Sequence, residues 1–143
     1  MSTKEIKALT LRFFEEFNKG KAAGMAAIDE ICDANVIYHN TLGMDVVGIN
    51  NFKQAMSSNY DAVPDGKLIL DDIIVEGDKA ALRYTSTGTH TGTFMGIPPT
   101  NKKVTIWILE IDRFSHGKIV EIWARTDTLG LMQQLGVVPM PKK

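Results

Sequence analysis

Four long β-rich runs fill the second half of this 143-residue chain and constrain its fold more than any other feature. They span Lys67–Val75, Lys79–His90, Lys103–Phe114 and Lys118–Asp127. Turn-forming triplets, Glu76-Gly77-Asp78 and Ser115-His116-Gly117, connect the first run to the second and the third to the fourth. Each connected pair is predicted to form an antiparallel hairpin, so the four runs should build a meander within one sheet.

The chain before Pro64 carries apolar side chains mostly at helical spacing. Ser2 and Glu5 form a capping-box pattern, and the apolar residues that follow predict a helix over 3–18. Further helices are predicted over 22–32 and 49–60, with a short β-type run from Asn35 to His39 between them, and a short helix over 128–135 near the end. Helices first and strands afterwards are typical of an α+β fold, here one domain of residues 1–143 with three N-terminal helices on one face of the sheet.

The run Lys103–Phe114 is apolar on both of its alternating sides. One side carries Ile106 and Ile108, and the other carries Trp107 and Leu109. An antiparallel strand of this kind is expected to be buried on both faces. One face should meet the helices. The other is expected to meet a second subunit, giving a homodimer through Trp107 and Trp123, or else to be covered by the C-terminal helix of the same chain.

Composition and charge exclude several classes of partner. The net charge is −1, from 16 basic and 17 acidic residues, and the only basic run is Lys142-Lys143, so neither nucleic acid nor an anionic membrane is an expected partner. No apolar stretch is long enough to cross a bilayer. The single cysteine, Cys32, rules out a disulfide framework and favours a cytoplasmic location. The three histidines lack metal-ligand spacing, so neither a metal nor another cofactor is expected.

The segment from Gly88 to Thr100 is predicted to form a folded flap. Its glycines recur every four residues, and Pro98 and Pro99 exclude a helix. The apolar residues Phe94 and Met95 would be out of place in a flexible linker, so the flap is expected to close the end of an apolar cavity. For His90, a hydrogen bond that holds the flap in place is favoured over contact with a ligand, because such a loop must satisfy its own polar groups.

Three segments carry a family resemblance and occur in order along nearly the whole chain. They are GTHTGTFMGIPPTNKKV at residues 88–104, RFSHGKIVE at 113–121 and DTLGLMQQLG at 127–136. Together they resemble the SnoaL-like polyketide cyclases of the NTF2-like superfamily. The resemblance implies a cone-shaped fold, in which a curved antiparallel sheet wraps around the helices and encloses a deep apolar pocket, and assemblies that are dimers or tetramers. It also implies ring closure of a polyketide-like carbonyl compound by aldol condensation, without metal or organic cofactor.

The residues at the expected catalytic positions are unusual. Family cyclases use an aspartate on the last strand as general base and a histidine on the preceding strand. Here the last-strand motif reads Glu121-Ile122-Trp123-Ala124, so Ala124 occupies the base position, and Glu110 occupies that of the assisting histidine. If the hairpin places Glu110 opposite Ile122, hydrocarbon surrounds its carboxyl group and should raise its pKa toward neutrality, as suits an acid or base. The structural alternative is a glutamate paired with arginine or hydrogen-bonded in the core.

The remaining candidate residues divide into a pocket wall, a flap and one orienting group. The pocket residues are Phe17, Phe52, Ala55, Met56, Ile106, Ile108, Ile122 and Ala124, of which Phe17 and Ala55 match pocket positions of the family; the flap residues are His90, Phe94 and Met95. His39 is expected at the pocket rim, where it would orient a substrate or bond to the local backbone.

Two functions follow. The first is a cofactor-free cyclase or isomerase, of the lyase or isomerase class, that acts on an apolar carbonyl compound with Glu110 and His39 as catalytic residues. The second is a non-catalytic protein that binds a small apolar molecule in the same pocket.

Overall fold

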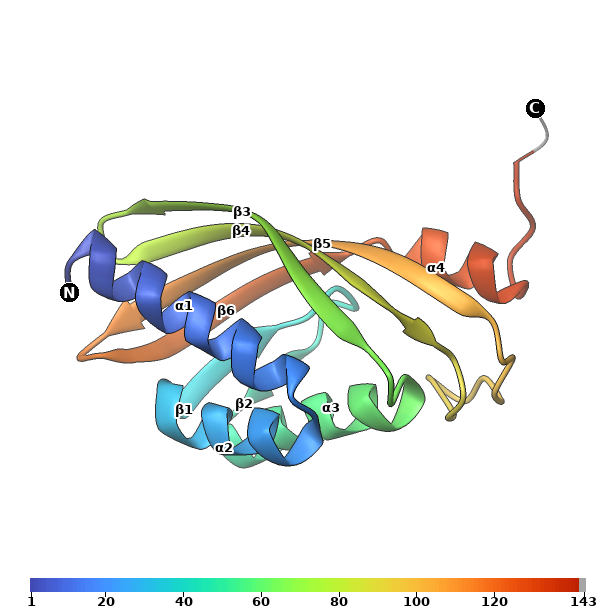
Figure 1. Ribbon diagram of the computed structural model, residues 1–143, viewed down its shortest axis with the longest axis horizontal. Coiled ribbons are helices and arrows are strands. Elements are labelled where there is room, and N and C mark those ends of the chain that lie inside the picture. Colours follow the sequence, from blue (N-terminus) through green and yellow to red (C-terminus); the bar gives the residue numbers. More distant parts are fainter. Residues whose placement is uncertain (142–143) are drawn as a thin grey trace.

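One six-stranded sheet carries the helices on one face, as Figure 1 shows for the computed structural model, which describes residues 1–141. In chain order the elements are α1 (Thr3–Asn18), α2 (Lys21–Ile31), β1 (Cys32–His39), β2 (Asp45–Val47), α3 (Ile49–Ala62), β3 (Lys67–Glu76), β4 (Lys79–Thr89), β5 (Lys103–Ser115), β6 (Lys118–Thr126) and α4 (Thr128–Leu135). The predicted helices and long strands therefore lie where the sequence places them. The short strand β2 and the first three residues of β1, Cys32 to Ala34, were not predicted as strand.

The sheet is mixed: the predicted antiparallel arrangement holds for every neighbouring pair except β1 and β6. The strand order is β2-β1-β6-β5-β4-β3, with β1 and β6 parallel and the other neighbours antiparallel. Parallel neighbours require a long crossover, and here α3 and the whole β3–β5 meander lie between the two strands in the sequence. Sequence periodicity gives no information on such a distant pairing, so only the hairpins could be predicted.

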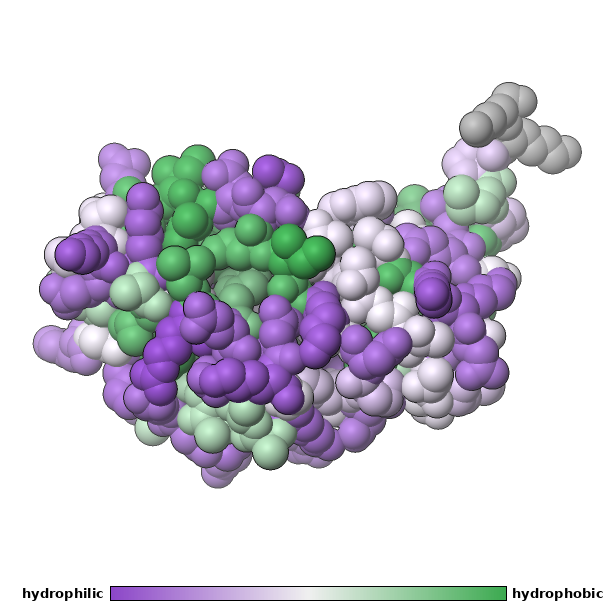
Figure 2. All heavy atoms as spheres, viewed as in Figure 1, coloured by the Kyte–Doolittle hydropathy of each residue, from purple (hydrophilic) through white to green (hydrophobic). Residues whose placement is uncertain are grey.

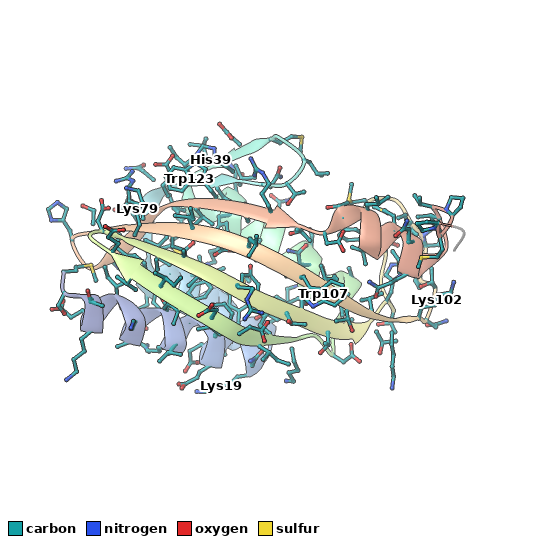
Figure 3. All side chains as sticks on the ribbon, turned by 90° about the horizontal axis from the view of Figure 1, so that it is seen from above. Lys19, His39, Lys79, Lys102, Trp107 and Trp123 are labelled. Carbon is teal, nitrogen blue, oxygen red and sulfur yellow. The ribbon has the colours of Figure 1, made fainter. Side chains whose placement is uncertain are left out.

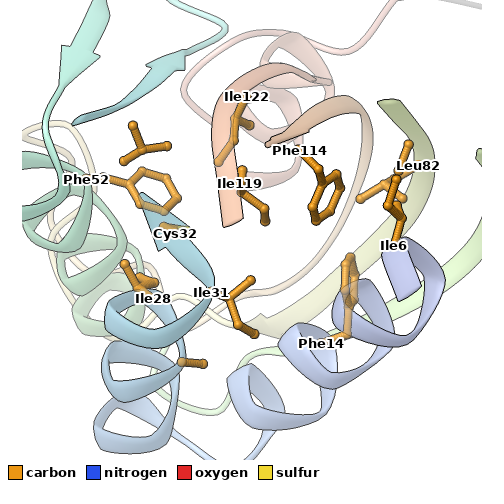
Figure 4. Close-up of a cluster of buried hydrophobic side chains, with 13 residues drawn as sticks. Ile6, Phe14, Ile28, Ile31, Cys32, Phe52, Leu82, Phe114, Ile119 and Ile122 are labelled. Carbon is orange, nitrogen blue, oxygen red and sulfur yellow. The ribbon is translucent and has the colours of Figure 1, made fainter. Parts of the chain in front are cut away.

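Helices α1, α2 and α3 pack beneath the sheet, and α4 lies at its far end near the flap (Figure 1). The core between the two layers is hydrocarbon, with Ile6, Ile28 and Val36 fully buried. Figure 4 shows Phe14 and Phe114 among the side chains that join α1 to the sheet. Burial of each such side chain contributes about 1.5–3 kcal/mol to folding. Among the helices within residues 1–141, none combines the length and apolar character needed to cross a membrane.

A β-bulge sets the register between β5 and β6. Pairing shifts between Arg113 and Phe114, where β6 has one extra residue, so that Glu110 lies opposite Ala124 and Asp112 opposite Ile122. The predicted pairing of Glu110 with Ile122 is therefore wrong by two residues: the bulge accounts for one, and the turn, which pairs Ser115 with Lys118, accounts for the other. Both acidic side chains still face the helices, since alternate residues of a strand share one face.

The outer face of the sheet stays exposed in the single chain. Trp107, Leu109 and Ile111 are 56%, 61% and 42% exposed, and Figure 3 shows Trp107 on this outer face. The alternative in which the C-terminal helix covers them is wrong, because the buried Leu131 of α4 packs against Val104 on the opposite face. Hydrophobic residues also gather on the side of the molecule that carries α1 and β3, bordered by hydrophilic ones (Figure 2).

Candidate functional site

A cavity of about 380 Å³ lies between the inner face of the sheet, helices α1 and α3, and the flap. Every position predicted for a pocket wall lies on it, as do the three flap residues, and their contact with a ligand stays a prediction: Phe17, Phe52, Ala55, Met56, Ile106, Ile108, Ile122, Ala124, His90, Phe94 and Met95. Aromatic contacts hold part of this wall in place. Phe13 and Phe17 stack with ring centres 4.8 Å apart, and Tyr38 meets Phe52 edge-on at 5.2 Å.

Backbone hydrogen bonds hold the flap against α3. The N–H groups of Thr91 and Gly92 both donate to the carbonyl oxygen of Ala62, at 3.1 and 3.0 Å. Gly92 lies so close to α3 that a Cβ atom at this position would collide with the carbonyl group of Asp61. The glycine is therefore required by close approach of two backbone segments, and the flap forms a folded wall of the cavity.

Two carboxyl groups meet in the cavity. Glu110 and Asp112 both line it; Asp112 is only 4% exposed, whereas Glu110 keeps some accessible surface on the cavity side. The hydroxyl group of Tyr84 donates to Oε2 of Glu110 at 2.6 Å. The carboxyl group of Asp112 lies beside that of Glu110, and its Oδ1 has no hydrogen-bond partner within residues 1–141. Two neighbouring carboxylates repel each other, and protonation of one of them relieves the repulsion.

Burial raises the pKa of both carboxyl groups. Burial raises the pKa of Glu110, while hydrogen bonds from Asp112 and Tyr84 oppose that rise because they stabilise the charged form. Burial, followed by the charge of Glu110, raises the pKa of Asp112 well above its usual range. These directions favour a proton on the more deeply buried Asp112 and leave Glu110 as the carboxylate that accepts the hydrogen bond of Tyr84.

Tyr38 adds a further polar group to the wall near Glu110. It lines the same cavity from β1, and burial, together with the charge of Glu110, raises its pKa to about 12. Burial likewise raises the pKa of Tyr84 well above its usual range. Both phenols consequently keep their protons at neutral pH, and the hydroxyl group of Tyr84 donates to the carboxylate.

His39 does not lie at the cavity, so its prediction as an orienting residue is wrong. Its Nδ1 lies 2.7 Å from Oδ1 of Asp45 and its Nε2 lies 2.7 Å from Oε2 of Glu121. The ring stacks on Trp123 at 5.4 Å on the outer face, as Figure 3 shows. The hydrogen bond to Glu121, followed by that to Asp45, raises the pKa of His39. The alternative prediction, that His39 bonds to the local backbone, is also wrong. Its side chain instead links Asp45 of β2 to Glu121 of β6.

Strand alternation explains both the error and the residues that were missed. Tyr38 pairs with Ile122, and His39 pairs with Trp123, so the tyrosine faces the cavity and the histidine faces away. Asp112 lies two residues after Glu110 on the same face, and Tyr84 lies opposite Ile108 on β4. Periodicity alone could have found Asp112. Tyr38 required knowledge of the parallel pairing with β6.

Comparisons with known proteins identify the family. The family model described as SnoaL-like polyketide cyclase matches residues 8–135. AclR from Streptomyces galilaeus, a candidate hydroxylase, is 31% identical with a TM-score of 0.87, covering 99% of this chain and 87% of that protein. TsrD from Streptomyces laurentii is 28% identical with a TM-score of 0.84, and the match covers 96% of this chain and 99% of that protein.

A further solved structure agrees in fold. The candidate SnoaL-like polyketide cyclase from Jannaschia sp. CCS1 is 21% identical with a TM-score of 0.88, covering 97% of this chain and 98% of that one. No protein with a curated description matches the sequence significantly. The mixed sheet, the helices on its inner face and the motif order agree with the family match over most of the chain. The protein belongs to the SnoaL-like polyketide cyclase family.

Proposed function

We propose that this protein is a cofactor-free enzyme that moves a proton on an apolar, polyketide-like carbonyl compound, with Glu110 as the acid/base group. The observation that carries the proposal is the neighbouring pair of carboxyl groups, Glu110 and Asp112, on the wall of an apolar cavity, with Tyr84 donating a hydrogen bond to Glu110. A buried carboxylate is a stronger base than one in water because its charge is poorly solvated. Cyclisation and isomerisation of ketones both begin with removal of a proton from carbon, which is the task for such a base.

The proposed step assigns one role to each polar group. The Glu110 carboxylate takes a proton from the carbon next to the substrate carbonyl, and the electron pair of that C–H bond moves into the enolate. Tyr38 O–H donates a hydrogen bond to the enolate oxygen, where negative charge develops. Glu110 then returns its proton to carbon or oxygen. Asp112 and Tyr84 hold the carboxylate of Glu110 in position from the other side.

Replacement of the usual last-strand aspartate by Ala124 favours this assignment over the family mechanism. Ala124 lies directly opposite Glu110, so its methyl group leaves the carboxylate free to reach the cavity. A second carboxylate at this position would add a like charge next to the existing pair, which is unfavourable in an apolar site. The acid/base function is thus proposed to lie on β5 in place of β6.

Deuterium exchange into simple ketones tests the proposal. 2-Tetralone, incubated with the protein in D₂O, should gain deuterium next to its carbonyl group faster than in buffer, as measured by mass spectrometry. Glu110→Gln keeps the size of the side chain and removes the base, so it should slow exchange about 10²–10⁴-fold. Tyr84→Phe, which removes one hydrogen bond to Glu110, serves as a matched variant with a smaller loss. Acceleration that survives Glu110→Gln unchanged would refute the acid/base role.

A non-catalytic binding protein is the second candidate, favoured by the loss of the family's catalytic aspartate at Ala124. Under this alternative, apolar ketones bind with micromolar affinity, and none is exchanged or converted faster than in buffer. Ala124→Asp provides a further comparison. A gain of aldol activity in that variant would indicate that the scaffold retained everything except the family base.

We also propose that two copies associate through the outer face of the sheet. Trp107 and Leu109 form an exposed apolar strip there, and a strip of this kind on an otherwise ordinary surface marks an interaction site. The charged groups around it, among them Arg83, Arg113 and Glu121, would form the polar rim of such an interface.

A further inference from the structure

The flap end of the cavity carries a buried hydrogen-bond donor that the proposed chemistry does not use. His90 is 2% exposed and is one of the residues that line the cavity. Its backbone N–H donates to the carbonyl oxygen of Lys102 at 2.9 Å, and its own carbonyl accepts from the N–H of Asn101 at 2.9 Å. These bonds join the two ends of the flap through backbone atoms alone, so the imidazole ring takes no part in them.

Contacts of the ring define its tautomer. The backbone N–H of Thr100 donates to Nδ1 of His90 at 3.2 Å, and the hydroxyl group of Thr100 lies 3.0 Å from the same nitrogen. A ring nitrogen that accepts a hydrogen bond from a backbone N–H carries no proton of its own. The proton of the neutral ring is therefore on Nε2. The ring thus uses Nδ1 for a hydrogen bond that holds the flap, as predicted, and its other nitrogen, Nε2, takes no part in that bond.

This second atom lacks a partner. Nε2 of His90 is buried, and no atom in residues 1–141 accepts a hydrogen bond from it. Buried donors without an acceptor are rare because folding has removed them from water. Nearby cavity-lining residues such as Phe94, Val104 and Leu131 are hydrocarbon, and Thr128 of α4, which also lines the cavity, makes no hydrogen bond to Nε2. A molecule that enters the cavity can supply the acceptor.

We infer that Nε2–H of His90 binds an acceptor oxygen of the cavity's ligand, as a polar subsite separate from Glu110. The inference rests on the proposed function only in that a ligand fills the cavity. Glu110 lies well within β5, whereas His90 is bonded to Lys102, just before that strand begins, so the two groups lie at different ends of the cavity. The ligand that satisfies both is an elongated, mostly apolar molecule with a carbonyl group at one end and an oxygen acceptor at the other.

Two probes and two variants test the subsite. 9-Fluorenone and fluorene share one tricyclic skeleton and differ in a single carbonyl oxygen. His90→Asn keeps an acceptor near the position of Nδ1 and loses the Nε2 donor, whereas His90→Gln can place an amide N–H near Nε2. The preference of the protein for fluorenone over fluorene, measured as a ratio of dissociation constants, should fall about tenfold in His90→Asn, the equivalent of one hydrogen bond, and be retained in His90→Gln.

Tyr38→Phe separates this subsite from the proposed catalytic end. A preference for fluorenone that is lost in Tyr38→Phe and kept in His90→Asn would overturn the inference and leave the proposed function standing. Failure of both probes to bind the native protein would overturn both. A ligand-free measurement covers the case of a misfolded flap variant: long-range ¹H–¹⁵N spectra of the native protein should report the proton of His90 on Nε2, and a proton on Nδ1 would overturn the inference.

Discussion

Replacing the buried Asp112 with asparagine should make the protein more stable at neutral pH relative to the native protein. A carboxyl group whose pKa is higher in the folded than in the unfolded state binds its proton more tightly when folded. Its contribution to stability is therefore greatest below the unfolded pKa and decreases as the pH rises toward the folded pKa. Burial raises the pKa of Asp112 well above its usual range, so the native protein should lose stability through this window. Asparagine keeps the shape of the protonated acid and a donor toward Glu110, and it has no proton to lose.

The size of the effect follows from the linkage between folding and proton binding. The free energy of unfolding of Asp112→Asn, minus that of the native protein, should increase by about 1.4 kcal/mol for each pH unit over which the folded pair keeps its proton and the unfolded chain does not. Between pH 5 and pH 7 the increase amounts to about 2.7 kcal/mol. The difference should be small near pH 4, where about half of the aspartate still carries its proton in the unfolded state.

Urea unfolding at pH 4, 5, 6, 7 and 8 measures this difference. Asp72→Asn, an exposed aspartate on β3, controls for the loss of one acidic side chain from the chain as a whole. A difference between Asp112→Asn and the native protein that stays constant with pH would refute the shared proton. A native protein that gains stability relative to the variant as pH rises would show that Asp112 is charged and favourably paired in the folded state.

Three further predictions concern the surface, the flap and the His39 cluster. Leu109→Glu should convert a dimer to a monomer in light scattering, because it places a charge in the exposed apolar strip; unchanged mass would exclude this face as the interface. Gly92→Ala should lower the free energy of unfolding by about 1–3 kcal/mol, since the added methyl group collides with the backbone of α3, and an unaltered denaturation midpoint would contradict the close approach. His39→Gln should cost stability below pH 6.5 and cost less as the pH rises through the raised pKa of His39, where the native ring loses its charge; a pH-independent cost would contradict the charged link between β2 and β6.

Local sequence patterns predicted the helices and strands of this fold, but they did not predict the pairing of strands that are distant in the sequence. Ser2, the predicted capping residue of the first helix, accepts a hydrogen bond from the backbone N–H group of Glu5, and Asp127 accepts one from Gly130 at the start of α4. The two tight turns likewise predicted the hairpins that β3 forms with β4 and β5 forms with β6. The parallel contact of β1 with β6 depends on the packing of α2 and α3 against the sheet, and no short window of the sequence contains that information.

The candidate site was predictable to the same extent. Alternation along β5 placed Glu110 on the inner face, and that placement did not depend on the wrong pairing partner. Asp112 was available from the same alternation, and its importance appears only when burial brings its carboxyl group against Glu110. His39 and Tyr38 could not be separated, because which of two adjacent residues faces the cavity depends on the register with β6.

The central claim, that one proton is shared by Glu110 and Asp112 inside the cavity, is tested most directly by ¹³C NMR of the carboxyl groups of labelled aspartate and glutamate. The account predicts a side-chain carboxyl signal that keeps its protonated chemical shift at pH 7 and disappears in Asp112→Asn. If every carboxyl group of the native protein instead titrates near the ordinary values of about 3.9 for aspartate and 4.3 for glutamate, the pair holds no proton at neutral pH and the account is contradicted.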